Sequence, residues 1–246
     1  MKKILKDYEE ITESFKILNQ YQNVVTIFGG ARIPKENKNY KKIQKLAYEL
    51  AKEGYSIMTG GGPGIMEAAN FGAFKAKSKN PNIVSIGLNI QLPHEQEMNP
   101  YVEIPLKFQN FFSRKLVFNH NSTAFIVAIG GFGTLDELSE VLVQIATGKH
   151  KKIPIILYGK EYWRGFIKWL KKQMLKENLI TKQELALLSL ADSPKEVLKI
   201  LKNGIPNPIH HKYNHKSRKQ CQNNRSKSCH IKSLTTKKVN ERFSIQ

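Results

Sequence analysis

The residues of this sequence best suited to chemistry are two acids, Asp136 and Glu137, that follow a glycine-rich turn in the segment IGGFGTLDELSEVL, residues 129–142. Thr134 can cap a helix that we expect to begin near Leu135, and the N–H groups and hydroxyl at such a helix end can bind a phosphate. Acids in a first helical turn commonly only complement the helix dipole. Beside a phosphate they could also stabilise a developing positive charge. The glycines of this turn are Gly130, Gly131 and Gly133.

Two earlier glycine-rich segments also follow apolar runs. TGGGPGIMEAAN, residues 59–70, leads into a helix whose N-terminus favours an anion. It lacks the Gly-Lys-Ser/Thr of a Walker A loop and the usual dinucleotide register of Gly-x-Gly-x-x-Gly. FGGARIP, residues 28–34, fits a ligand turn or a plain strand-to-loop turn equally well. The candidate ligand contacts in these two segments are Gly29, Gly61, Gly62, Gly64 and Met66.

A basic pair precedes the third glycine turn. The segment FQNFFSRKLVFNH, residues 108–120, carries Arg114 and Lys115 among phenylalanines that we expect to lie in the core. Both bases could be ordinary solvated side chains. Arg114 is nevertheless well suited to a bidentate contact with phosphate or carboxylate.

Apolar runs of strand length alternate with amphipathic stretches, which is the pattern of a parallel sheet covered by helices. The expected strands are NVVTIFGG, YSIMTGG, NIVSIGLN, STAFIVAIGG and KIPIILYG. The expected helices span residues 40–52, 65–77, 108–119, 135–147 and 163–176. We therefore predict an α/β fold, a Rossmann-like doubly wound parallel sheet with helices on both faces.

Four of the five expected strands run straight into glycine, at the sheet edge where ligands bind in open α/β folds. An amphipathic helix is expected before Gln22. A last helix is expected in SPKEVLKILKNG, with Ser193 as its cap, Pro194 in its first turn and Gly204 as its stop. We predict a single Rossmann-like nucleotide-binding domain with an N-terminal helix over residues 1–204.

Almost half of the net charge of +20 lies in the last sixth of the chain. Residues 203–246 hold ten Lys/Arg and one Glu, so we expect residues 205–246 to form a basic, disordered tail. Contact of this tail with nucleic acid is a weaker alternative. The tail also holds both cysteines and four histidines, but their spacing fits no standard zinc finger, and we expect no metal site.

Neither a membrane span nor a signal peptide is expected. No stretch approaches the ~18 consecutive apolar residues that a span needs, and charged residues interrupt the N-terminal segment. We predict a cytoplasmic protein without a membrane partner.

Three separated motifs together resemble the Lonely Guy family of cytokinin-activating phosphoribohydrolases, long mislabelled as lysine decarboxylases. They are GGGPGIMEAAN, the Arg114–Lys115 pair and GGFGTLDE, and the resemblance covers residues 22–180. The segment SIGLNIQLPHEQEMNPY resembles the larger bacterial branch. The resemblance implies a Rossmann-like fold, homodimers or higher assemblies, no cofactor, and hydrolysis of a nucleoside 5′-monophosphate to free base and ribose 5-phosphate.

The resemblance also implies roles for particular residues. The family's catalytic arginine and glutamate fall on Arg114 and Glu137, and its ribose-contacting carboxylate falls on Glu95, with Glu97 as the alternative. Ile129 stands where the family's Pro-Gly-Gly-x-Gly-Thr-x-x-Glu signature has proline, and isoleucine can also end a strand, so the loop can keep its shape. The substrate or phosphate contacts would further include Lys115, Asp136 and the glycine turns with Thr134.

The hypothesis is therefore an N-glycosidase in which Glu137 orients the attacking water or stabilises an oxocarbenium-like sugar. Arg114 positions the substrate or assists the leaving base, and the turn from Gly130 to Thr134 holds the 5′-phosphate. Purine, pyrimidine and prenylated adenine all remain open as the base. A non-catalytic carrier of a phosphate-bearing cofactor, of the molybdenum-cofactor carrier type, is the alternative. Lysine decarboxylation is disfavoured, because no Schiff-base lysine with a pyridoxal phosphate site is identifiable.

Overall fold

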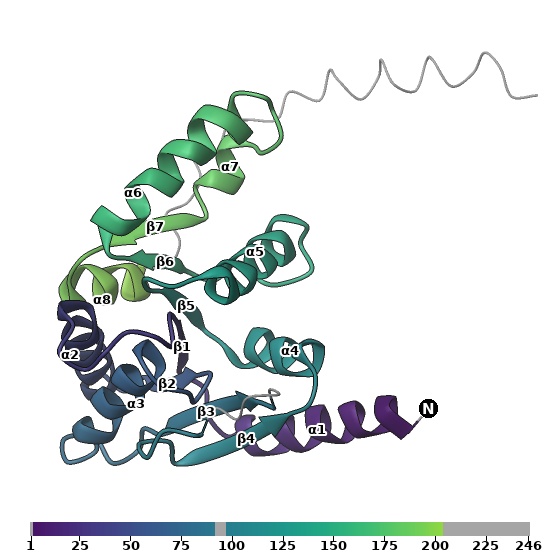
Figure 1. Ribbon diagram of the computed structural model, residues 1–246, viewed down its shortest axis with the longest axis vertical. Helices are drawn as coiled ribbons and strands as arrows, with labels where there is room; N and C mark the ends of the chain where they lie inside the picture. Colours follow the sequence, from purple (N-terminus) through teal and green to yellow (C-terminus); the bar gives the residue numbers. More distant parts are fainter. Residues whose placement is uncertain (1, 92–96, 204–246) are drawn as a thin grey trace, which may run out of the picture. The chain divides into compact units, whose positions relative to one another are not determined.

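The fold is built on one sheet of seven parallel strands, as a computed structural model of residues 2–91 and 97–203 describes it (Figure 1). The strand order is β4-β3-β2-β1-β5-β6-β7. The strands are β1 (Val24–Phe28), β2 (Ser56–Thr59), β3 (Ser85–Ile90), β4 (Ile104–Phe108), β5 (Ala124–Val127), β6 (Ile155–Tyr158) and β7 (Leu188–Ala191). This architecture confirms the predicted α/β, Rossmann-like fold.

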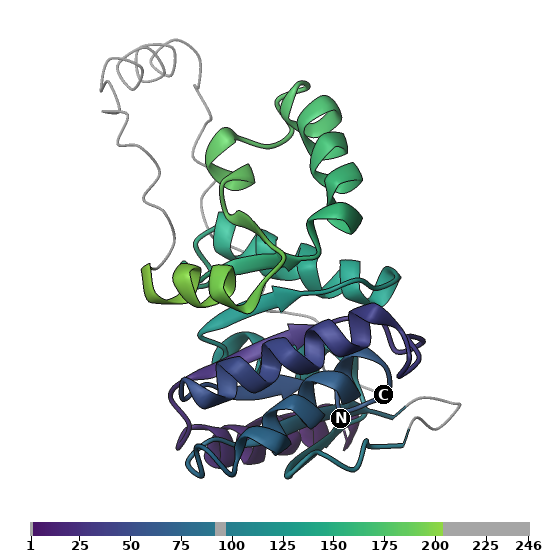
Figure 2. The same ribbon diagram turned by 90° about the vertical axis from the view of Figure 1, so that its left-hand side faces the viewer.

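Helices cover both faces of the sheet, and α2, α3 and α8 lie on the face opposite α4 and α5 (Figures 1 and 2). The helices are α1 (Lys2–Leu18), α2 (Lys38–Lys52), α3 (Ile65–Ala76), α4 (Phe111–Asn121), α5 (Phe132–Ala146), α6 (Lys160–Trp169), α7 (Lys182–Leu185) and α8 (Pro194–Asn203). A π-helix, η1 (Leu170–Leu175), continues α6. The expected helices before Gln22 and after Ser193 are both present, and the Glu196 N–H donates to the Ser193 hydroxyl over 3.3 Å.

The central strands are apolar on both sides because both faces are covered. Val25 and Ile27 of β1 pack with α2 and α3, whereas Val24 and Phe28 pack with α4 and α5. All five residues of β1 are buried. A parallel sheet enclosed in this way reads as a continuous apolar run instead of an alternating one.

The sequence missed the strands at the two edges of the sheet. β4 has the sequence IPLKF, in which a proline and a lysine interrupt the apolar pattern, and β7 has only four residues, LSLA. Prolines and charges are tolerated at a sheet edge because one side of the backbone has no neighbour to pair with. Phe108 consequently ends β4 and does not begin a helix; α4 begins at Phe111.

Several expectations fall on residues outside the described part of the chain. These are the carboxylate at Glu95, the stop at Gly204 and the basic tail of residues 205–246. Within residues 2–91 and 97–203, no helix combines the length and apolar character needed to cross a bilayer.

Gly72 of α3 provides a test of the packing between α2 and α3. A Cβ atom there would lie 2.2 Å from the Gln44 carbonyl oxygen and 2.9 Å from the Ala47 Cβ, so Gly72→Ala must push two helices apart. We expect a loss of about 1–3 kcal/mol in the free energy of unfolding, measured by urea denaturation.

Gly165→Ala in α6 is the matched control. Beyond the backbone of α6 and the neighbouring residues, a Cβ atom there meets no described atom within 4 Å, so the helix propensity of alanine should raise stability by about 0.5–1 kcal/mol. Equal effects of the two substitutions would contradict the close α2–α3 contact.

Candidate active site

The candidate site lies where the direction of the strand order reverses. β1 and β5 are neighbours, yet the chain leaves β1 toward α2 on one face of the sheet and leaves β5 toward α5 on the other. Such a switch point opens a crevice at the carboxyl ends of the strands. The two turns meet there, because the Gly30 N–H donates to the Ile129 carbonyl oxygen over 2.9 Å.

The turn after β2 lies at the same place and contacts the turn after β1. The Ile65 N–H donates to the Gly30 carbonyl oxygen over 3.0 Å, which ties the start of α3 to the turn after β1. Gly64 has φ +68°, and a Cβ atom there would lie only 2.4 Å from that carbonyl oxygen. A Cβ at Gly29 would lie 2.3 Å from the Ile65 side chain. Three motifs distant in the sequence therefore form one cluster of closely packed backbone.

The helix after β5 begins earlier than the sequence predicted. α5 starts at Phe132 with Gly131 as its N-cap, so Thr134 lies inside the helix and does not cap it. Asp136 and Glu137 accordingly lie beyond the first turn, which contains no acid. The extended backbone of Gly131 (φ −100°, ψ −153°) allows the helix to start without a capping side chain. Thr134 is buried and lies against the backbone of Gly130.

Arg114 and Glu137 face each other across α4 and α5. The Arg114 Nη2 lies 3.7 Å from the Glu137 Oε1, and the two side chains are only 10% and 16% exposed. The Arg114 Nε donates to the Leu88 carbonyl oxygen over 2.8 Å, and its guanidinium lies 5.2 Å from the ring centre of Phe118. The guanidinium also packs against Gly60, where a Cβ atom would lie 2.4 Å from Nη2.

The environment of this pair alters its protonation. Burial raises the pKa of the Glu137 carboxyl to about 7, although the nearby charge of Arg114 acts to lower it. Burial likewise lowers the pKa of the Arg114 guanidinium. A carboxyl with a pKa near neutrality can accept or donate a proton under physiological conditions, as a general acid or base must.

Lys115 and Asp136 form an ion pair between α4 and α5. The Lys115 Nζ lies 2.9 Å from the Asp136 Oδ2 and 2.8 Å from the Glu140 Oε2. The Asn119 amide also donates to Glu140, over 3.1 Å. This cluster links α4 to α5 and so holds the helices that carry Arg114 and Glu137.

Three groups of the site were not singled out from the sequence. The Leu88 carbonyl, which orients Arg114, is a backbone atom without a sequence signal. Gly60 stands within the quoted glycine run, but its contact with Arg114 depends on the fold. The Tyr162 hydroxyl donates to the Gly130 carbonyl oxygen over 2.6 Å, and only the adjacency of β5 and β6 brings α6 close enough.

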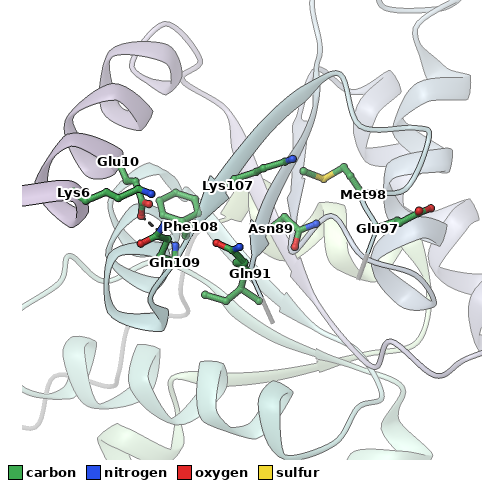
Figure 3. A pocket seen from close by; sticks show the side chains of 10 residues that line it. Lys6, Glu10, Asn89, Gln91, Glu97, Met98, Lys107, Phe108 and Gln109 are labelled. Carbon is green, nitrogen blue, oxygen red and sulfur yellow. Dashed lines mark hydrogen bonds between the residues drawn. The ribbon is translucent and has the colours of Figure 1, made fainter. Parts of the chain in front are cut away.

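A cavity of about 520 Å³ lies beyond the carboxyl ends of β3 and β4, beside α1 (Figure 3). Glu97, the alternative to Glu95, lines it together with Lys107 and Gln91. Met98 also lines it and packs against the β2 turn, since a Cβ atom at Gly61 would lie 2.4 Å from its sulfur. In residues 2–91 and 97–203, no group of three or more His, Cys, Asp or Glu side chains could hold a metal ion.

Comparison with known proteins now places the chain in a family. The family model described as "Possible lysine decarboxylase" matches residues 66–201, a range that includes both Arg114 and Glu137. The chain belongs to this family, the Lonely Guy family.

Two plant relatives are similar over most of the chain. The probable cytokinin riboside 5′-monophosphate phosphoribohydrolase LOGL6 of Oryza sativa subsp. japonica is 25% identical, with 80% of this chain and 78% of the relative covered. The cytokinin riboside 5′-monophosphate phosphoribohydrolase LOG1 of Arabidopsis thaliana is 26% identical, with 66% and 74% covered.

Solved structures share the fold of this member of the Lonely Guy family. The molybdenum cofactor binding protein of Rippkaea orientalis aligns with a TM-score of 0.53 at 24% identity, covering 74% of this chain and 96% of its own. The X-ray structure of TM1055 aligns with a TM-score of 0.55 at 22% identity, covering 74% and 99%. These similarities support the fold alone.

The raised pKa of Glu137 makes a prediction about stability. Between its ordinary value of 4.5 and about 7, the folded protein keeps a proton that the unfolded chain has lost. The free energy of unfolding should therefore fall as pH rises through this window. Glu137→Gln cannot ionise, so its stability relative to the original protein should increase from pH 4.5 to 7 and level off above, in urea titrations at each pH.

Glu53→Gln is the control, because the hydrogen bond with Lys202 lowers the pKa of the Glu53 carboxyl. This variant should not gain stability relative to the original protein over the same window. Parallel stability curves for Glu137→Gln and the original protein would refute a raised pKa at Glu137.

Proposed function

We propose that this protein hydrolyses the N-glycosidic bond of nucleoside 5′-monophosphates, such as AMP or a cytokinin riboside monophosphate, to free base and ribose 5-phosphate. The observation that carries the proposal is the buried Arg114–Glu137 pair beside the glycine turns at the switch point. Family membership and the names of the plant relatives support the same reaction.

The glycine turns would hold the phosphate. The N-terminus of α5 presents the N–H groups of its first turn. Beyond the neighbouring residues and the backbone of α5, no described atom lies within 4 Å of a Cβ placed at Gly131 or Gly133. Backbone N–H groups and the helix dipole together favour an anion at such a place. Anchoring the phosphate there would hold the sugar in a fixed position relative to Glu137.

Glu137 would act on the sugar. As the bond between the anomeric carbon and the base nitrogen breaks, the sugar gains positive charge, which the ionised Glu137 carboxylate stabilises. A water molecule then adds its oxygen to the anomeric carbon and gives up a proton. Glu137 can accept that proton, because its pKa of about 7 lies close to neutral pH.

Arg114 would act on the other half of the reaction. The electron pair of the broken bond goes to the leaving base, and a neighbouring cation stabilises the charge that develops there. The Arg114 Nε already donates a hydrogen bond to the Leu88 carbonyl oxygen, whereas its Nη2 lies toward Glu137. Arg114 is thus held in one orientation before a substrate arrives, which reduces the reorganisation that the reaction requires.

A cofactor carrier is the alternative that shares the glycine turns. A carrier needs a phosphate site, but it has no need of a buried carboxylate whose pKa is raised toward neutrality. The Arg114–Glu137 pair therefore favours the hydrolase.

Removal of the carboxylate tests the assignment directly. Glu137→Gln keeps the size of the side chain but can neither ionise nor accept a proton, so kcat/KM for AMP should fall by about 10²–10⁴-fold. Chromatography of free adenine and ribose 5-phosphate provides the measurement.

Glu53→Gln, which breaks a surface ion pair with Lys202, should leave the AMP reaction unchanged. Substantial turnover by Glu137→Gln would contradict the catalytic role of Glu137. Absence of hydrolysis by the original protein across AMP, CMP and a prenylated AMP would instead favour the carrier.

The pH dependence of the rate tests how the two groups interact. If ionised Glu137 is the active form, kcat/KM should rise with pH and level off above about 7. The charge of Arg114 lowers the pKa of Glu137, so Arg114→Met should move the rising limb to higher pH as well as reduce the rate. Arg164→Met, at an exposed position of α6, should leave the limb in place. A limb that stays fixed in Arg114→Met would show that the groups do not interact.

A further inference from the structure

Four buried polar side chains form a hydrogen-bonded network that contacts the glycine turn after β2. They come from β2, α3, β3 and the segment after β3, and each is at most 7% exposed. They are Thr59, Asn70, Ser85 and Asn99. Such groups are costly to bury unless they are hydrogen-bonded, and in the described residues no buried side-chain nitrogen or oxygen lacks a partner.

Asn99 holds the backbone of the turn at two successive carbonyls. Its Nδ2 donates to the Gly61 oxygen over 3.0 Å and to the Gly62 oxygen over 3.1 Å. Its backbone N–H donates to the same Gly61 oxygen over 2.8 Å. One residue therefore determines the direction of two peptide planes in the turn.

Asn70 and Thr59 hold the turn from the other side of Gly61. The Gly61 N–H donates to the Thr59 hydroxyl over 2.9 Å, and that hydroxyl donates to the Asn70 Oδ1 over 2.6 Å. The Asn70 Oδ1 also accepts from the Asn99 Nδ2 over 3.0 Å. The Asn70 Nδ2 donates to the Ser85 hydroxyl over 2.8 Å, which fastens the whole network to β3.

Because the peptide bond is planar, these contacts also fix the direction of the Gly62 N–H. No described peptide bond is cis, so the N–H of Gly62 points opposite to the Gly61 carbonyl. Because Asn99 binds that carbonyl, the Gly62 N–H points away from the buried network. Among the hydrogen bonds of the described residues, this N–H has no acceptor. A ligand is the natural partner for an oriented, unpaired N–H at a sheet's carboxyl edge.

We propose that Asn99, supported by Asn70, is a positioning residue that orients the Gly62 N–H toward an anionic oxygen of the substrate. The inference rests on the proposed function, since it assigns the turn a nucleoside monophosphate. It extends the site to Asn99, an uncharged residue after β3 that fixes the geometry of the turn. Asn99 acts through the backbone of Gly61 and Gly62 and does not touch the substrate.

Asn99→Asp is the sharpest test because it preserves shape. It replaces the donor Nδ2 with an oxygen that faces three acceptors, two carbonyls and the Asn70 Oδ1. The turn should then shift, and KM for AMP and the Kd for ribose 5-phosphate should rise by about tenfold or more, with kcat reduced less. Amide hydrogen exchange at Gly61 should become faster. Asn99→Ala, which introduces no charge, should show the same pattern more weakly.

Asn121→Asp is the matched control. The Asn121 Nδ2 also donates to a backbone carbonyl, that of Val117 over 2.8 Å, but at the end of α4 and away from the turn. This variant should lose some stability yet keep the KM, the Kd and the exchange rate at Gly61. A loss of affinity equal to that of Asn99→Asp would show that reduced stability alone is responsible.

The remaining outcomes separate this inference from the proposed function. Faster exchange at Gly61 with unchanged KM and Kd would show a purely structural network and overturn the inference, as would unchanged exchange. If the original protein hydrolyses no nucleotide, the proposed function fails. Calorimetry with ribose 5-phosphate and inorganic phosphate then decides the inference: weaker binding by Asn99→Asp supports it, and unchanged or absent binding overturns it.

Discussion

The burial of the Glu137 carboxylate away from water is the constraint on which the rest of this structure depends. Its ionised form is unfavourable at such a depth without a cation nearby, and Arg114, itself buried, supplies that cation at 3.7 Å. The separation is too long for a good hydrogen bond, so the pair leaves both groups able to bind something else. The surrounding elements hold this pair at a fixed separation.

Two kinds of contact hold the pair in place. The Leu88 carbonyl and the ring of Phe118 orient the arginine, and the ion pairs of Lys115 with Asp136 and Glu140 join the helices that carry both members. Salt bridges that are partly exposed contribute little to stability. Their value here is geometric, because α4 and α5 lie on the same face of the sheet and could otherwise slide relative to each other.

The backbone turns opposite the pair obey a steric constraint. Gly64 has a left-handed backbone and lies against the Gly30 carbonyl, so any side chain there would separate two turns that must touch. Hydrogen bonds from Asn99 and Tyr162 bind the carbonyls of the turns at Gly61, Gly62 and Gly130. The N–H groups of Gly62 and Gly131, which lie in the same peptide planes as the Gly61 and Gly130 carbonyls, therefore point away from these donors.

The sequence by itself determined the fold class and the positions of the three glycine turns. Apolar periodicity and glycine are local signals, and parallel strands necessarily bring their carboxyl ends to one edge. Local signals did not predict the edge strand β4, because Pro105 and Lys107 interrupt its apolar pattern. They also placed the start of α5 too late, because Gly131 is its N-cap without a capping side chain. Only the tertiary structure decided that Arg114 lies beside Glu137 and that Lys115 forms an ion pair with Asp136. It also decided that Asn99 donates a hydrogen bond to the turn after β2. Each of these contacts joins residues more than 20 positions apart. The side-chain directions that make them depend on how α4, α5 and the turns pack around the sheet, which no short stretch of sequence encodes.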